Sequence, residues 1–167
     1  MKLPIFIFVA SAVSGVIADF WLVYLNYNKL GGPLIAGPNY AEGGAFLKSP
    51  ELNNCNVNIG PYNIWGNTDD VSGDKTGMRT VPGKTVPPPM YRDPLDIVEF
   101  NTGNQKPGHH TIYKDRNYTM VDVNGKVTGQ CVLDRAYLVN LNCPWDDTTV
   151  KLIGSSMFYC VSDIELD

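Results

Sequence analysis

Two neighbouring histidines, His109 and His110, are the residues with the clearest chemical potential in the sequence. Histidine exchanges protons near neutral pH, so a pair can supply a general acid and a general base. Glu99 lies upstream as a further acid–base candidate, and Arg92 and Arg116 could stabilise a phosphate. Together they would suit a metal-independent ribonuclease or another hydrolase. Neighbouring side chains on a strand point to opposite faces, so both histidines can serve one site only from a loop. The simpler interpretation is a turn pair that leads into a strand.

The segment 67–74 collects oxygen-bearing side chains around Gly73, which is the chemistry that calcium prefers. It lacks EF-hand spacing and a closing glutamate, so a solvated acidic turn is favoured. The sequence has no Cys-x-x-Cys pair for zinc and no glycine loop for a phosphate. We therefore expect no metal and no cofactor.

Four cysteines have a structural interpretation. An even number in an exported chain favours two disulfides, and the sequence alone leaves three pairings open. Three of the cysteines lie near the C-terminus, so at least one bridge has to join the two halves of the chain. The cysteines are Cys55, Cys131, Cys143 and Cys160.

The elements that would position these residues are short β-type runs between turn residues, which is typical of an all-β protein. The run 19–27 is apolar on both faces and predicts a central, buried strand. Asn124-Gly125 predicts a two-residue type I′ hairpin that pairs Val121 with Thr128 and points Cys131 inward. About eight strands are expected, and residues 33–50 are expected to be loop-like. The remaining expected strands are 95–100, 111–114, 118–123, 126–133, 137–141, 149–153 and 157–161, and 56–59 and 62–65 could add two short ones.

These runs predict a single-domain antiparallel β-sandwich or small β-barrel with long irregular loops, stapled by disulfides. The longest irregular stretch is 66–94, which is rich in proline and glycine. Aromatic residues could line a sugar-binding face, although a place in the core is favoured. They are Trp21, Tyr24, Tyr27, Tyr62, Trp65, Tyr91 and Trp145.

The N-terminus has the three zones of a signal peptide: a lysine, an apolar run and small residues that end at Ala18. We expect cleavage there, which gives a secreted β-rich domain over residues 19–167. The loss of Lys2 leaves 12 basic and 17 acidic residues among the 149 that remain, a net charge of −5. Such an acidic chain favours neither nucleic acid nor an anionic membrane as partner. Asn117-Tyr118-Thr119 is an acceptor for an N-linked glycan at a predicted turn.

The chain resembles the small secreted, effector-like proteins of filamentous fungi. The resemblance rests on the signal peptide, the Asp19-Phe20-Trp21 start, the even number of cysteines, and the segment from Thr111 to Cys131. It implies an extracellular protein that interacts with a host and has no conventional active site, and it assigns no role to any residue.

The function expected from the sequence is therefore non-enzymatic binding of an extracellular protein or glycan. The 66–94 loop and the 104–110 turn are the expected binding surface, because functional residues concentrate on loops held by a rigid sheet. Two alternatives remain: a secreted ribonuclease- or glycosidase-like hydrolase that uses His109 or His110 with Glu99, and a carbohydrate-binding module.

Overall fold

The computed structural model describes residues 18–30, 40–47, 55, 64–66, 68–81, 95–145 and 148–164. Ten strands and one short 3₁₀ helix, η1 (Lys114–Arg116), make up this part of the chain. The strands are β1 (Ala18–Leu30), β2 (Tyr40–Leu47), β3 (Ile64–Gly66), β4 (Gly77–Val81), β5 (Ile97–Asn101), β6 (His109–Tyr113), β7 (Thr119–Asp122), β8 (Val127–Leu133), β9 (Leu138–Trp145) and β10 (Thr148–Ser162).

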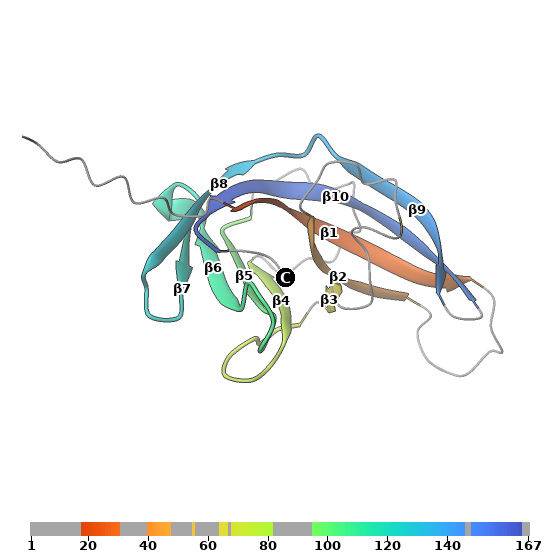
Figure 1. Ribbon diagram of the computed structural model, residues 1–167, viewed down its shortest axis with the longest axis horizontal. Coiled ribbons are helices and arrows are strands. Elements are labelled where there is room, and N and C mark those ends of the chain that lie inside the picture. Colours follow the sequence, from red (N-terminus) through yellow and green to blue (C-terminus); the bar gives the residue numbers. More distant parts are fainter. Residues whose placement is uncertain are drawn as a thin grey trace, which may run out of the picture.

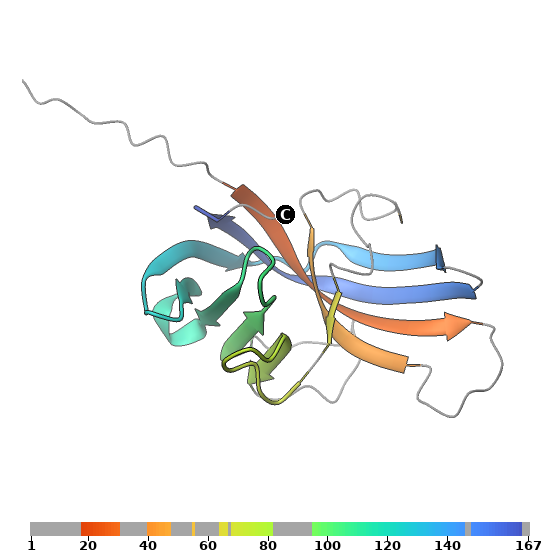
Figure 2. The same ribbon diagram turned by 60° about the horizontal axis from the view of Figure 1, so that its bottom comes forward.

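All ten strands belong to one antiparallel sheet that curls until its ends nearly meet. Nine of them follow the order β3-β2-β1-β10-β8-β7-β6-β5-β4, β9 pairs with β10 as a branch from this path, and β4 lies against β2 and β3. Strands β4 to β7 form one side of the barrel, and β1, β2, β9 and β10 continue beyond it as a long arm (Figures 1 and 2). The predicted all-β fold is confirmed, and its form is a nearly closed barrel.

Strand β1 is central because both of its faces are apolar. Phe20 and Leu22 face the barrel interior, and Val23 and Leu25 face the opposite side; all four are fully buried. Because β1 is paired with β2 on one side and β10 on the other, its backbone hydrogen bonds are satisfied along both edges. The predicted central strand is therefore confirmed, and it is longer than the expected 19–27.

Strand β10 is one continuous strand where the sequence predicted two. Its register against β1 shifts between the pairs Leu22–Phe158 and Val23–Ser156, so Met157 is an extra residue on β10. Such a bulge bends a strand without ending it. The N-terminal part of β10 pairs with β9 and its C-terminal part with β8, so β10 connects the arm to the barrel.

Two hydrophobic cores lie on opposite faces of the sheet. The barrel core is built around an aromatic row in which Phe46 packs edge-on against Phe20 and Phe100, with ring centroids 5.7 and 4.9 Å apart. Such pairs add to the free energy of simple burial. The second core covers the other face of the arm and contains residues of β1, β2, β9 and β10 such as Leu25, Val139 and Leu152, with Cys55 packed against it.

Two elements lie where irregular structure was expected. Strand β2 falls within 33–50, and β4 falls within 66–94, so both regions are more ordered than predicted. Gly44 explains part of the difference, because the Met78 sulfur lies 2.5 Å from the position that a Cβ at residue 44 would occupy. A glycine that looks like a turn residue in the sequence here lets β2 and β4 approach each other.

The hairpin between β7 and β8 differs from the type I′ prediction. Val121 pairs with Val127, one position away from the predicted Thr128, and Gly125 is the turn residue with a positive φ, 77°. The carboxylate of Asp122 accepts hydrogen bonds from the backbone N–H of Asn124 and Lys126. These bonds favour a three-residue loop with a left-handed glycine at its end. Cys131 nevertheless points inward as predicted, with 1% of its surface exposed.

The four cysteines form two disulfides. Cys55 is joined to Cys143 on β9 across 88 residues, which is the expected bridge between the two halves of the chain. Cys131 and Cys160 lie opposite each other on β8 and β10, so this bridge pins the last strand to the sheet as predicted.

Some predictions fall outside this structure or at its edge. The expected strand 56–59, the prolines of 82–94 and residues 1–17 lie outside the described residues. The predicted cleavage after Ala18 falls at the first residue of β1, so the strand from Asp19 onward would remain. In the described part, no helix has the length and apolar character needed to cross a membrane.

Candidate functional site

A row of charged side chains crosses three neighbouring strands of the barrel. Arg79 on β4 lies directly opposite Glu99 on β5, and its Nη1 donates to Glu99 Oε2 at 3.0 Å. Glu99 Oε1 lies 3.0 Å from Nε2 of His109 on β6. The antiparallel register places all three on one face, because Glu99 is two residues from Asn101, the partner of His109. The predicted contact between His109 and Glu99 is therefore present.

The two histidines do not share a site. Both lie within β6, so His110 points to the opposite face and is only 6% exposed, with its ring against Phe100. Burial lowers the pKa of His110 below its usual value, and the carboxylate of Asp122 partly opposes this effect. Its Nδ1 has no hydrogen-bond partner within the described structure. Strand geometry therefore separates the two histidines, so the alternative in which both serve one site is not assembled here.

A surface pocket of about 710 Å³ lies beside this charged row, between the loop before β4 and the turn from β5 to β6. We call it the turn pocket. It is lined by Gly73, Asp74, Thr76, Asn101, Thr102, Gly103, Asn104, Gln105, His109 and Val123. The pocket therefore includes three residues of the 66–94 loop and three of the 104–110 turn, the two segments that the sequence favoured as a binding surface.

Two buried polar residues fix the walls of the turn pocket. The Asn101 amide donates to the carbonyl oxygens of Val71 and Gly73, both at 3.0 Å, and its Oδ1 accepts from the Gly103 N–H at 2.9 Å. Asn101 therefore ties the loop before β4 to the β5–β6 turn. It is only 3% exposed, so these bonds are shielded from water.

Thr102 holds the β5–β6 turn in the same way. Its hydroxyl donates to the Gln105 carbonyl at 2.6 Å and accepts from the Gly108 N–H at 2.7 Å. Gly103 and Gly108 have φ values of 68° and 81°, which glycine adopts without strain. The turn is thus shaped by its own side chains.

Other polar side chains at the pocket remain available for a ligand. Within the described structure, the side chains of Asp74, Thr76, Asn104 and Gln105 make no hydrogen bond, and all four residues are exposed. Val123 reaches the pocket from the tip of the β7–β8 hairpin and is 68% exposed. The pocket therefore offers donors, acceptors and one aliphatic surface on fixed walls.

The 67–74 segment is a turn held by its own contacts. The Asp70 carboxylate accepts from the Ser72 N–H at 2.9 Å and forms an ion pair with Lys75. These contacts hold the pKa of Asp70 well below its usual range. No group of three or more metal-binding side chains occurs among the described residues. The Asp70 side chain thus has its partners within this turn and at Lys75.

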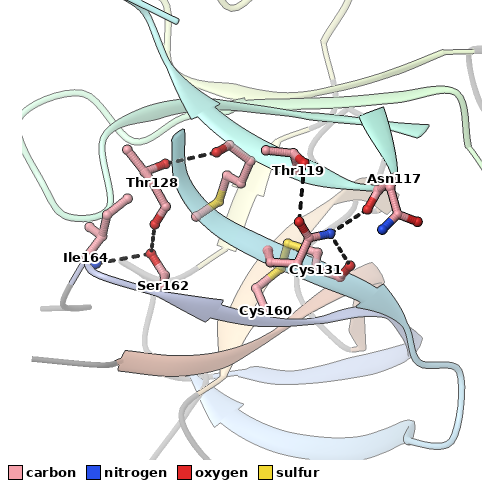
Figure 3. The surroundings of a disulfide bond; sticks show 9 residues. Asn117, Thr119, Thr128, Cys131, Cys160, Ser162 and Ile164 are labelled. Atoms are coloured by element: carbon pink, nitrogen blue, oxygen red, sulfur yellow. Dashed lines mark hydrogen bonds between the residues drawn. A yellow bond between two sulfur atoms is a disulfide. The ribbon is translucent and has the colours of Figure 1, made fainter. Parts of the chain in front are cut away.

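The surroundings of the Cys131–Cys160 disulfide include the glycan acceptor (Figure 3). Asn117 is exposed and left-handed, with φ 54°, at the end of η1. The Thr119 hydroxyl donates to the Arg116 carbonyl at 2.6 Å, and the Gln130 amide donates to the Asn117 carbonyl. On the other side of the bridge, the Ser162 hydroxyl donates to the Thr128 carbonyl and accepts from the Ile164 N–H.

The other candidates whose side chains the structure describes do not line the turn pocket. Arg116 stacks over the Tyr113 ring, 4.4 Å from its centroid, and Arg92 lies outside the described residues. Tyr24 is fully buried in the barrel core. Trp21 is half-buried against Tyr137, and its indole N–H donates to Asp134 at 2.9 Å. The side chains of Tyr27, Tyr62, Trp65, Tyr91 and Trp145 lie outside the described structure.

Three important residues were not identified from the sequence. Arg79 joins the charged row only through the pairing of β4 with β5, which a local pattern does not reveal. Asn101 and Thr102 precede a glycine in a predicted turn, and Asn and Thr there commonly bond to nearby backbone. That pattern could have marked them as residues that shape the turn.

Comparisons of this chain with protein-family models, with curated proteins and with solved structures find no match. The function of the site therefore has to be inferred from its geometry. That geometry is a polar pocket with fixed walls, next to the row formed by Arg79, Glu99 and His109.

Proposed function

We propose that this protein is a secreted binding protein and that the turn pocket is its binding site. The observation that carries the proposal is the locking of both pocket walls by the buried Asn101 and Thr102, while the exposed polar side chains at the rim remain unbonded within the described structure. A pre-organised site loses less entropy when a ligand binds. A pocket of this volume is in the range that holds small ligands or a protruding part of a larger partner.

Secretion is supported by the signal-peptide pattern and the two disulfides. Disulfides persist in oxidising compartments, so two bridges in a small domain are consistent with an extracellular protein. Mass spectrometry of a secreted sample tests this part of the proposal. We expect a chain that begins at Asp19 and lacks four cysteine hydrogens, and an intact residue 1 would contradict it.

Glycosylation at Asn117 is a second feature of the proposed secreted protein. Asn117 is exposed on the turn that follows η1, and glycans are attached at exposed asparagines of this kind. We expect a mass decrease when a secreted sample from a eukaryotic host is treated with an amidase that removes N-linked glycans. Thr119→Ala should abolish that decrease and Thr119→Ser should keep it, whereas an unchanged mass in the wild-type protein would contradict the modification.

The binding proposal is tested with a variant that blocks the pocket. Gln105→Arg places a long charged side chain at the rim, and Asn140→Arg makes the same charge change at an exposed position of β9. Mature, oxidised protein would be immobilised and exposed to extracellular-matrix and cell-wall extracts, and the retained material would be quantified. We expect wild type and Asn140→Arg to retain the same partner and Gln105→Arg to lose it. Equal retention of the partner by the wild type and both variants would refute the turn pocket as the binding site.

A secreted hydrolase is the second candidate function, because His109, Glu99 and Arg79 lie within hydrogen-bonding distance in a row. On RNA, the 2′-hydroxyl would attack phosphorus and lose its proton to Glu99. The bond from phosphorus to the 5′-oxygen would break, and the leaving oxygen would take a proton from His109. This function ranks second because the acid and the base bond to each other, and Arg79 already neutralises Glu99.

Turnover measurements separate the two functions. If the protein is a hydrolase, His109→Ala and Glu99→Gln should abolish the release of products from RNA or polysaccharide, whereas His110→Phe should retain activity because His110 is buried. No turnover by the wild-type protein, combined with loss of partner binding in Gln105→Arg, would leave binding as the function.

A further inference from the structure

The charge of the turn pocket narrows its ligand class. Of its ten lining residues, Asp74 is the only one with a carboxylate, and none is lysine or arginine. A phosphate or nucleic-acid ligand would need cationic partners, and a divalent cation would need several oxygen ligands with negative charge. The pocket matches neither, so a neutral ligand fits it best.

The hydrogen-bonding groups indicate a ligand with many hydroxyls. The side-chain amides of Asn104 and Gln105 each carry donors and acceptors, and Thr76 adds a hydroxyl. Asp74 adds an acceptor. A sugar hydroxyl is both donor and acceptor, so it can pair with any of these groups. An apolar ligand would bury all four and leave them unpaired, at a cost in free energy.

The shape of the pocket suits a sugar ring. Gly73 and Gly103 line it without a side chain, so a ring can approach the backbone closely. The exposed methyl groups of Val123 offer an apolar contact for the C–H face of a pyranose. A volume of about 710 Å³ is in the range of sites for drug-sized ligands, so a short oligosaccharide segment can enter it.

We propose that the turn pocket binds a segment of a neutral oligosaccharide, through the rim amides of Asn104 and Gln105 with Asp74 and Thr76, and with Val123 against the ring face. This inference rests on the proposed binding function and names its ligand class. It differs from the alternative of an aromatic sugar-binding face, since His109 is the only aromatic side chain among the described residues that line the pocket.

The test is a titration of mature, isotope-labelled protein with six-residue probes, followed by two-dimensional amide NMR. The probes are β-1,3-glucan, β-1,4-glucan, chitin-type and mannan oligosaccharides, with polygalacturonate as the charged comparison. We expect saturable shifts at the amides of 73–76, 102–105 and Val123 with a neutral probe. Absence of shifts with every neutral probe, or shifts confined to the Trp21–Tyr137 surface, would overturn the proposal.

Paired variants measure the role of the amides. Asn104→Ala with Gln105→Ala should weaken the dissociation constant at least tenfold, because two hydrogen bonds are lost. Asn140→Ala with Asn142→Ala removes two exposed amides from β9 and should leave it unchanged. Equal affinity in both double variants would overturn the assignment. If Gln105→Arg no longer retains the partner found in the extracts while no neutral sugar binds, the proposed binding function stands and the proposed ligand class is wrong. If Gln105→Arg retains the partner and no neutral sugar binds, both proposals are wrong.

Discussion

Replacing Asn101 with alanine is expected to destabilise the protein strongly. The side chain makes three hydrogen bonds of 2.9–3.0 Å to Val71, Gly73 and Gly103 and is 3% exposed. At about 1 kcal/mol net for each bond, the loss is about 3 kcal/mol. For a domain of this size, the melting temperature should fall by roughly 6–12 °C.

Urea unfolding followed by tryptophan fluorescence measures this change directly. Asn104→Ala is the matched control, since it removes the same amide from the same turn where no hydrogen bond is made within the described structure, and it should change stability by less than about 0.5 kcal/mol. Asn101→Asp keeps the acceptor for Gly103 but loses both donated bonds, so it should not restore stability. If Asn101→Ala unfolds at the wild-type urea concentration, or no earlier than Asn104→Ala, the account of the pocket walls is refuted.

Three further predictions concern the scaffold. Burial lowers the pKa of His110, so the unfolded chain binds a proton at this residue more readily than the folded protein does. The stability should therefore fall as the pH drops below about 6.5. In His110→Phe the urea-unfolding midpoint should depend less on pH between pH 7 and 5, and the same pH dependence as in the wild type would contradict this. Gly154→Ala should cost roughly 3 kcal/mol or prevent folding, because a Cβ there meets the Tyr24 carbonyl and the Leu25 backbone; a normal melting curve would refute the close approach. Removing the Cys131–Cys160 bridge with two alanines should cost about 3 kcal/mol in the same unfolding assay, and a loss below about 1 kcal/mol would argue against its role.

Local sequence patterns predicted the strands and turns that are determined by residues close to them in the sequence. The two-sided apolar run of β1, the hairpin region of β7 and β8, and the inward direction of Cys131 are all confirmed. The type of hairpin was wrong because the Asp122 side chain, two residues before Asn124, decides the turn. Glycine-rich β2 was missed because its strand depends on β1 and on Met78, which are distant in the sequence.

The candidate site was predicted in its location but not in its construction. The 104–110 turn and part of the 66–94 loop do form one pocket, and Glu99 does contact His109. The two histidines face opposite sides because the strand begins at His109, two residues earlier than expected. Arg79 and the wall-fixing Asn101 depend on contacts across strands and loops, which no local spacing specifies.

The pairing of β1 with β10 has a consequence for how the chain is made. Ala18 lies opposite Ser162, so the first strand to emerge during synthesis has to wait for the last one before its edge is covered. Until then, a strand with two apolar faces is exposed to aggregation. Pairing between distant segments also slows folding. The sheet can therefore be completed only after β10 has been synthesised, which keeps one edge of β1 without its partner until then.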